Sequence, residues 1–205
     1  MNPEPASLVL LSGGIESLTL LHLERRGGAT QALFVDYGQR AALRERACAL
    51  AQCRELDVPL ATFELATLGE TFRRGHTWRA HVPLPHRNLA LLGLAFSYAA
   101  DRGLRRLCLA LNQDDTLAYA SASTPFVDAF RTLSATLDDI EISTPLLHWS
   151  KSEVIRQGLA LGVDYALSYS CLLGRPIPCG SCPQCEKRRL AFAEIGCVDP
   201  ALNGG

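Results

Sequence analysis

VLLSGGIESLTLL, Val9 to Leu21, places an apolar run directly before a Ser-Gly-Gly turn and a leucine-rich segment. The pattern predicts a short buried strand, a tight turn and a helix. Glycines let the backbone amides of such a turn converge, and the start of the following helix carries partial positive charge. The stretch therefore predicts either an anion site or no more than a tight connection. It is neither a Walker A loop, which needs a Lys-Ser/Thr pair, nor a GxGxxG loop.

Strand and helix patterns alternate along the rest of the chain. Apolar runs bounded by turn residues predict strands at residues 7–11, 31–35, 60–65, 106–111 and 141–144. Helical spacing predicts helices at residues 16–26, 41–56, 88–100, 124–137, 151–161 and 186–195, and Ser150 to Glu153 is typical of a capping box. Residues 69–86, with breakers such as Gly75, are expected to form an irregular surface loop. The alternation favours an α/β fold with a doubly wound parallel sheet of about five strands.

The composition indicates one main domain with a small appendage. With 205 residues, of which 48% are hydrophobic, the chain is long enough for one well-buried core and short for two. We expect an α/β domain at residues 1–163 and a C-terminal segment at residues 164–205. The formal net charge of −1 gives no global reason to expect binding to nucleic acid or to a membrane surface. The sequence shows neither a leader pattern nor an apolar run of membrane-spanning length, so we expect a cytoplasmic protein.

Four of the eight cysteines crowd together as Cys171, Cys179, Cys182 and Cys185. Two consecutive CxxC steps bring sulfurs close enough to share one tetrahedral ion, and four thiolates leave no open position for water. The spacing predicts a structural zinc site. Two disulfides or an iron-sulfur cluster are the alternatives, and a cytosolic location disfavours the disulfides.

Several motifs together resemble one family. SGGIES resembles the SGGxDS loop of the ATP pyrophosphatases. FVDYGQR, Phe34 to Arg40, and PHRN, Pro85 to Asn88, resemble segments of the 7-cyano-7-deazaguanine synthases in that group, the latter their PGRN motif. Asp115, Tyr119 and Phe126 fit that family's D-x3-Y-x6-F spacing, and the cysteine cluster resembles its zinc site. The similarity spans nearly the whole chain, from about Val9 to Arg188.

The resemblance assigns roles to the polar residues near the carboxyl edge of the sheet. It implies ATP contacts from Ser12, Gly13, Gly14, Ser17, Asp36, Tyr37, Gly38, Arg87 and Asn88, substrate contacts from Gln113, Asp115 and Tyr119, and catalytic roles for Glu16, Arg87 and Lys151. The residues alone leave alternatives open. Asp36 could bind nucleotide or Mg²⁺ or cap a turn, Arg87 could pair with phosphate or lie on the surface, and Lys151 could meet an anion or be solvated.

The resemblance also implies a reaction. ATP with Mg²⁺ converts 7-carboxy-7-deazaguanine into an acyl adenylate, ammonia gives the amide, and a second ATP-dependent activation of the amide yields the nitrile. The protein contributes positioning and charge stabilisation. A two-fold dimer is the expected assembly, because two-fold dimers are the commonest oligomers.

Departures from the family pattern keep three hypotheses open. Glu16 replaces an aspartate, His86 a glycine and Gln113 a glutamate, and Ser121-Ala122 stand where the family usually has Asp-Cys. The first hypothesis is a nitrile-forming synthase. The second is a branch enzyme that stops at the amide or transfers the acyl group to another amine, such as one on a protein, with a role in anti-phage defence. The third is a non-catalytic module that binds nucleotide or deazaguanine.

Overall fold

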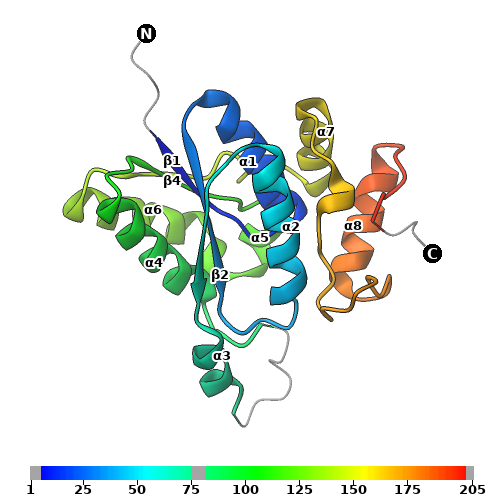
Figure 1. Ribbon diagram of the computed structural model, residues 1–205, viewed down its shortest axis with the longest axis horizontal. Coiled ribbons are helices and arrows are strands. Elements are labelled where there is room, and N and C mark those ends of the chain that lie inside the picture. The colour runs from blue at the N-terminus through cyan, green and yellow to red at the C-terminus, as the bar shows by residue number, and fades with distance from the viewer. Residues whose placement is uncertain (1–5, 75–81, 202–205) are drawn as a thin grey trace.

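A five-stranded parallel sheet forms the centre of the protein in the computed structural model, which describes residues 6–74 and 82–201 (Figure 1). The strands are β1 (Ser7–Leu10), β2 (Thr30–Asp36), β3 (Leu60–Glu64), β4 (Arg106–Leu109) and β5 (Glu141–Ser143). They lie in the order β3-β2-β1-β4-β5, and each adjacent pair is parallel. The strand order reverses at β1, which creates a crevice at its carboxyl end. The predicted doubly wound sheet is confirmed.

Helices follow most strands, as the alternating pattern predicts. They are α1 (Ile15–Gly27), α2 (Ala42–Glu55), α3 (Ala66–Arg73), α4 (Arg87–Asp101), α5 (Gln113–Ala118), α6 (Thr124–Leu137), α7 (Lys151–Leu161) and α8 (Pro183–Glu194). The predicted capping box begins α7: the Glu153 amide donates to Ser150 Oγ at 3.2 Å, and the Ser150 amide donates to the Glu153 carboxylate at 2.7 Å.

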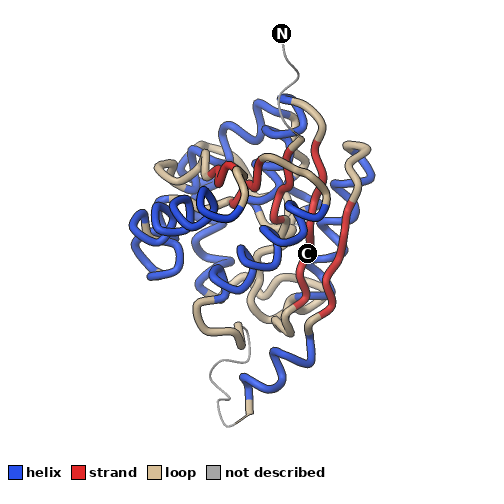
Figure 2. Tube along the Cα trace, turned by 90° about the vertical axis from the view of Figure 1, so that its left-hand side faces the viewer, coloured by secondary structure: helices blue, strands red, loops and turns tan. Residues whose placement is uncertain are grey.

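The sheet buries apolar side chains on both faces. Leu8 and Val9 are neighbours on β1 and belong to different core clusters, because successive strand residues point to opposite faces. Leu8 packs in the cluster that includes residues of α4 and α6, whereas Val9 packs in the cluster that includes residues of α1, α2, α7 and α8. Figure 1 shows α4 and α6 on one side of the strands and α1, α2, α7 and α8 on the other, and Figure 2 shows the helices beside the strands in a second view. Two covered faces explain why the strands are nearly continuous apolar runs.

The prediction of an irregular loop over residues 69–86 is wrong at its start, where α3 ends only at Arg73. Gly69, the first residue of the expected loop, is instead a closely packed residue of this helix. A Cβ atom there would lie 2.1 Å from the carbonyl oxygen of Tyr37, so only glycine allows α3 to pack against the turn after β2. Residues 75–81, the middle of that predicted loop, lie outside the described residues.

The C-terminal segment packs on the α1 and α7 side of the sheet. Tyr165 and Phe192 are buried in the same cluster as Val154 of α7, with the two rings edge to face at 5.7 Å. The division of the chain between residues 163 and 164 stays a prediction.

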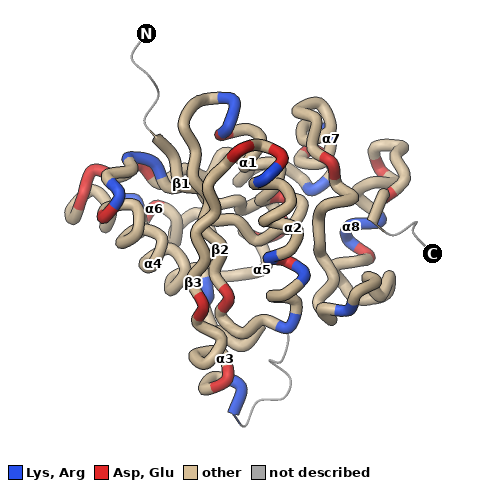
Figure 3. Tube along the Cα trace, viewed as in Figure 1, with Lys and Arg blue, Asp and Glu red and all other residues tan. Residues whose placement is uncertain are grey.

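Lys and Arg segments are interspersed with Asp and Glu segments on α2 and α8 (Figure 3). Within the described ranges, no helix combines the length and apolar character needed to cross a membrane.

Candidate functional site

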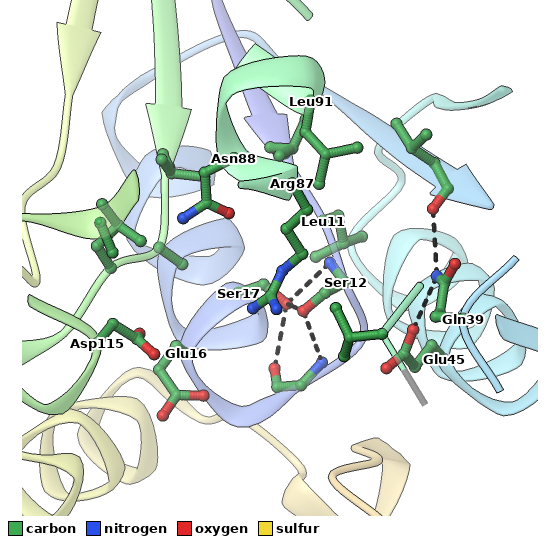
Figure 4. A pocket seen from close by; sticks show the side chains of 18 of the residues that line it. Leu11, Ser12, Glu16, Ser17, Gln39, Glu45, Arg87, Asn88, Leu91 and Asp115 are labelled. Atoms are coloured by element: carbon green, nitrogen blue, oxygen red, sulfur yellow. Dashed lines mark hydrogen bonds between the residues drawn. The ribbon is translucent and has the colours of Figure 1, made fainter. Parts of the chain in front are cut away.

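A cavity of about 270 Å³ opens at the carboxyl ends of β1, β2 and β4, in the crevice where the strand order reverses (Figure 4). This is the edge at which open α/β sheets bind ligands. Ten of the residues with predicted site roles line it. They are Ser12, Gly14, Glu16, Ser17, Tyr37, Arg87, Asn88, Asp115, Tyr119 and Lys151.

Gly13, Asp36, Gly38 and Gln113 do not line the cavity. The Asp36 carboxylate accepts from the Gly38 amide at 2.9 Å, so it closes the turn after β2. Gln113 is exposed as the first residue of α5, and its backbone N–H donates to the Trp149 carbonyl at 3.0 Å. Their ligand roles stay predictions.

The Ser-Gly-Gly turn is held in shape by its own side chains. Ser17 Oγ accepts from the Ser12 amide at 3.1 Å, lies 3.0 Å from Ser12 Oγ and donates to the Gly14 carbonyl at 3.2 Å. Gly14 is the N-cap of α1, and the first amides of this helix have no partner within it. Such amides beside a glycine turn can bind an anion, and this role stays a prediction for the turn.

Gly13 is required for two independent reasons. Its φ of +75° lies in the left-handed region, and a Cβ atom would be 2.3 Å from the carbonyl oxygen of Glu45 on α2. The turn and the first turn of α2 are thus in close contact. The Tyr169 amide also donates to the Gly13 carbonyl at 2.9 Å, which joins the C-terminal segment to the same turn.

Glu16 lies between two donors from distant parts of the chain. Lys151 forms an ion pair with Glu16 Oε1, and Asn112 Nδ2 donates to the same oxygen at 3.0 Å. Burial favours the neutral carboxyl, but the charge and hydrogen bond of Lys151 outweigh it and lower the pKa of Glu16 below its ordinary value. Glu16 is therefore ionised at neutral pH.

Asp115 takes part in a second capping box, which the sequence prediction missed together with α5. Its amide donates to Asn112 Oδ1 at 3.0 Å, and its carboxylate accepts from the Asn112 amide at 3.3 Å. Burial and the nearby negative charge of Glu16 raise the pKa of Asp115. The signal that could have revealed the helix is the spacing Asn-x-x-Asp, an aspartate form of the capping box.

Arg87 begins α4 and extends over the cavity toward the serine turn, as Figure 4 shows. Its guanidinium lies 5.6 Å from the ring centre of Tyr119. Asn88, the next residue, is buried, and its Nδ2 donates to the Ser121 carbonyl at 2.9 Å. Arg87 thus presents its charge to the cavity, while Asn88 ties α4 to the segment after α5.

Glu45 and Gln39 also line the cavity, and neither was predicted to do so. Gln39 Nε2 donates to the Glu45 carboxylate at 3.0 Å and to the Val35 carbonyl at 3.2 Å, and its oxygen accepts from the Tyr37 amide at 2.9 Å. Burial raises the pKa of Glu45, although the hydrogen bond from Gln39 opposes this. No local pattern distinguishes Glu45 from Glu55, the other acidic residue of α2, because the place of Glu45 beside the turn follows from helix packing.

The four clustered cysteines converge as predicted. One Sγ atom from each of Cys171, Cys179, Cys182 and Cys185 lies within 4.8 Å of the others, and all eight cysteines of the chain are free thiols. Tetrahedral zinc with Zn–S bonds of about 2.3 Å needs sulfurs roughly 3.8 Å apart, so the group fits such an ion. Hydrogen bonds from backbone amides, that of Ser181 foremost, lower the pKa of Cys179 to about 6, which favours the thiolate. The structure therefore contains a group that could hold a metal.

The C-terminal segment also forms part of the cavity wall. Tyr169, Ser170 and Leu172, which flank Cys171, line the cavity, as does Gln184 at the start of α8. These residues lie more than 150 positions from the serine turn in the sequence, and no motif marks them. The cysteine group and the cavity are thus joined through a few residues of one segment.

Sequence comparison identifies relatives across the whole chain. A family model described as "Queuosine biosynthesis protein QueC" matches residues 6–196. A 7-cyano-7-deazaguanine synthase of Methanoregula boonei is 34% identical over 211 residues, covering 95% of this chain and 97% of the relative. One from an Anaeromyxobacter species is 35% identical over 227 residues, covering 98% and 97%. The synthase 1 of Sulfurisphaera tokodaii is 31% identical over 195 residues, covering 95% and 96%.

Solved structures share the fold at lower identity. The U34-tRNA thiolase NcsA from Methanococcus maripaludis matches with a TM-score of 0.60 and 15% identity, covering 95% of this chain and 67% of the other. NMN synthetase from Francisella tularensis matches with a TM-score of 0.57 and 20% identity, covering 98% and 82%. At these identities the likeness shows the fold alone.

Proposed function

This chain belongs to the QueC family of queuosine biosynthesis proteins, and from this premise we propose that it is an ATP-dependent 7-cyano-7-deazaguanine synthase. Its substrate would be 7-carboxy-7-deazaguanine, and its products the nitrile, AMP and pyrophosphate. One observation carries the proposal. The serine turn at the start of α1, Arg87 at the start of α4 and Lys151 at the start of α7 meet in one cavity, as a reaction between a polyphosphate and a carboxylate requires.

In the first step, a carboxylate oxygen of the substrate attacks the α-phosphorus of ATP. The bond to the bridging oxygen breaks, pyrophosphate leaves, and an acyl adenylate forms. The amides of the serine turn and the start of α1 would hold the pyrophosphate. Arg87 would offset negative charge on the α-phosphate, because its guanidinium reaches over the same turn. Mg²⁺ bound to the phosphates would neutralise charge there, and the ionised Glu16 carboxylate is a suitable oxygen ligand for it.

In the second step, ammonia attacks the acyl carbon, AMP departs, and loss of a proton gives the primary amide. A second ATP then transfers AMP to the amide oxygen with release of pyrophosphate. Loss of that oxygen as AMP, together with the remaining N–H protons, leaves the carbon-nitrogen triple bond. No side chain of the enzyme needs to act as a nucleophile, so positioning and charge stabilisation are its contribution.

One observation favours a second candidate function. A neutral amide oxygen is a weaker nucleophile than a carboxylate oxygen, so the second activation depends more on stabilisation of the phosphate charge than the first. The pairing of Lys151 with Glu16 reduces the positive charge available for it. An enzyme that stops at the amide, or passes the acyl group to an amine on a protein, needs only the first activation.

A single incubation tests both candidates. Purified protein receives Mg·ATP and 7-carboxy-7-deazaguanine, with and without ammonia, and mass spectrometry follows the small molecules and candidate acceptor proteins. Nitrile supports the synthase. Amide as the end product, or a deazaguanine mass added to a protein, supports the second candidate. Release of neither AMP nor pyrophosphate under all conditions would contradict both.

We further propose that the cysteine group binds one structural zinc ion per chain. Four thiolates complete a tetrahedral shell, so the ion would not take part in the reaction. Cys185→Ser should abolish bound zinc, as measured by elemental analysis of the purified protein. Cys197→Ser is the matched control, because Cys197 is exposed and lies outside the group. Iron and acid-labile sulfide in the wild-type protein would instead support a cluster.

A further inference from the structure

Asn112 is buried beside the cavity, with only 1% of its surface exposed, and the proposed reaction gives it no role. Both ends of its side chain are engaged. Oδ1 accepts from the Asp115 amide at 3.0 Å, and Nδ2 donates to Glu16 Oε1 at 3.0 Å. An aspartate lacks the donor and a serine lacks the length, so the two contacts together call for an amide side chain.

The contacts of Glu16 are one-sided. Lys151 and Asn112 both bind Oε1. Oε2 has no hydrogen-bond partner among the described residues and is close to the serine turn, 4.0 Å from the position that a Cβ atom on Gly14 would take. A glutamate side chain has one more rotatable bond than an aspartate and loses more conformational freedom when it is fixed. Two donors on one oxygen fix the longer chain and leave the other oxygen for a ligand.

We propose that Asn112 is a positioning residue that holds the Glu16 carboxylate with Oε2 directed at the phosphate-binding turn, where it serves the divalent cation of Mg·ATP. The inference rests on the proposed use of ATP. It explains how a carboxylate one methylene longer than the family's aspartate serves the same turn: Asn112 and Lys151 hold Oε1, so that Oε2 is left for the cation.

The alternative is that Asn112 only caps α5, and Asn112→Ser separates the two roles. Serine is a good N-cap and keeps the acceptor for the Asp115 amide, but it does not reach Glu16. We expect this variant to bind Mg²⁺ with the α,β-methylene analogue of ATP about tenfold more weakly, the loss expected for one hydrogen bond to a charged group. Affinity for the metal-free analogue should be unchanged. Titration calorimetry with and without Mg²⁺ measures both.

A double-mutant cycle with Glu16→Asp provides the second readout. The shorter carboxylate is out of reach of Asn112, so Asn112→Ser should change Mg²⁺-dependent affinity by less than about twofold in that background. An equal loss in both backgrounds, or no loss in the wild-type background, would overturn the inference. If Asn112→Ser does not fold, Asn112→Thr is the replacement, because threonine also keeps an N-cap acceptor for the Asp115 amide and cannot reach Glu16. Wild-type protein that fails to bind the Mg²⁺ complex would instead contradict the proposed function.

Discussion

Lys151 at the start of α7 forms an ion pair with Glu16 at the start of α1, although the two residues are 135 positions apart. Their side chains are 11% and 18% exposed, so the pair is shielded from water without being fully buried. The same pair explains why the pKa of Glu16 is lowered despite burial. It also places a balanced pair of charges, and not a free lysine, beside the serine turn.

Lys151→Met should destabilise the protein at pH 7 by about 1 to 3 kcal/mol, between the values for surface and buried pairs. The pKa of Glu16 in the folded protein is lowered from its ordinary value of 4.5. The ion pair therefore stabilises the fold above pH 4.5, and this stabilisation is lost as the pH falls through the folded-state pKa. The free energy of unfolding, measured by urea denaturation, should therefore rise less between pH 3 and pH 7 for the variant than for wild type. Equal rises would refute the assignment.

Glu45→Gln should have the opposite pH signature. The pKa of Glu45 is raised in the folded protein, which means that the fold favours the neutral carboxyl. Glu45 therefore stabilises the fold below pH 4.5, and this stabilisation is lost as the pH rises through the folded-state pKa. The variant should be at least as stable as wild type at pH 7 and lose less stability as pH rises from 4. Denaturation midpoints at matched pH values test this. A variant less stable than wild type at pH 7 would mean that Glu45 has an unrecognised favourable partner.

Gly13→Ala should be far more damaging than Gly103→Ala. Both glycines have positive φ, +75° and +64°, so both variants carry a similar backbone strain of about 1 kcal/mol. Only at Gly13 would the new methyl group meet α2, at 2.3 Å from Glu45 O, whereas nothing lies within 4 Å at Gly103. Thermal denaturation compares the two. Similar losses would show that the turn can move away from α2 at little cost.

His86→Gly should stabilise the protein by up to about 1 kcal/mol. His86 caps α4 with φ of 46° and is exposed, so its side chain occupies a left-handed conformation that glycine adopts without strain. Asp57, the other non-glycine residue with positive φ among the described residues, provides the comparison through Asp57→Gly. Denaturant titration should show that both glycine variants have a higher free energy of unfolding than wild type. A loss at His86 alone would reveal a stabilising contact of the imidazole.

Asp199→Asn should destabilise the protein by about 3 to 5 kcal/mol, because it leaves the Arg188 charge buried without its partner. Arg188 donates to both Asp199 oxygens, at 2.9 and 2.7 Å, and the side chains are 2% and 4% exposed. The neighbouring Lys187 pairs with Asp114 at the surface, at 3.4 Å. Lys187→Met is therefore the control and should cost less than about 1 kcal/mol. Chemical denaturation of both variants gives the comparison, and comparable effects would contradict the prediction.

Local sequence patterns determined the framework. The apolar runs determined five strands, and the capping box at Ser150 located the start of α7, because periodicity and caps act over a few residues. The close spacing of the four cysteines likewise determined a convergent thiol group. Where the local signals were unfamiliar or misleading, prediction failed. Gly69 is a packing residue of α3, and the Asn112 capping box begins a helix that was not expected.

The tertiary structure alone decided which side chains share the cavity and which partners they have. Ser12, Arg87 and Lys151 were predicted from separate motifs, but nothing local pairs Lys151 with Glu16, places Asn112 on the same oxygen or sets Glu45 beside Gly13. Asn112 and Glu16 are 96 positions apart, and Lys151 and Glu16 are 135 positions apart. They depend on how α1, α2, α5 and α7 pack around one sheet edge, and packing is a property of the whole fold.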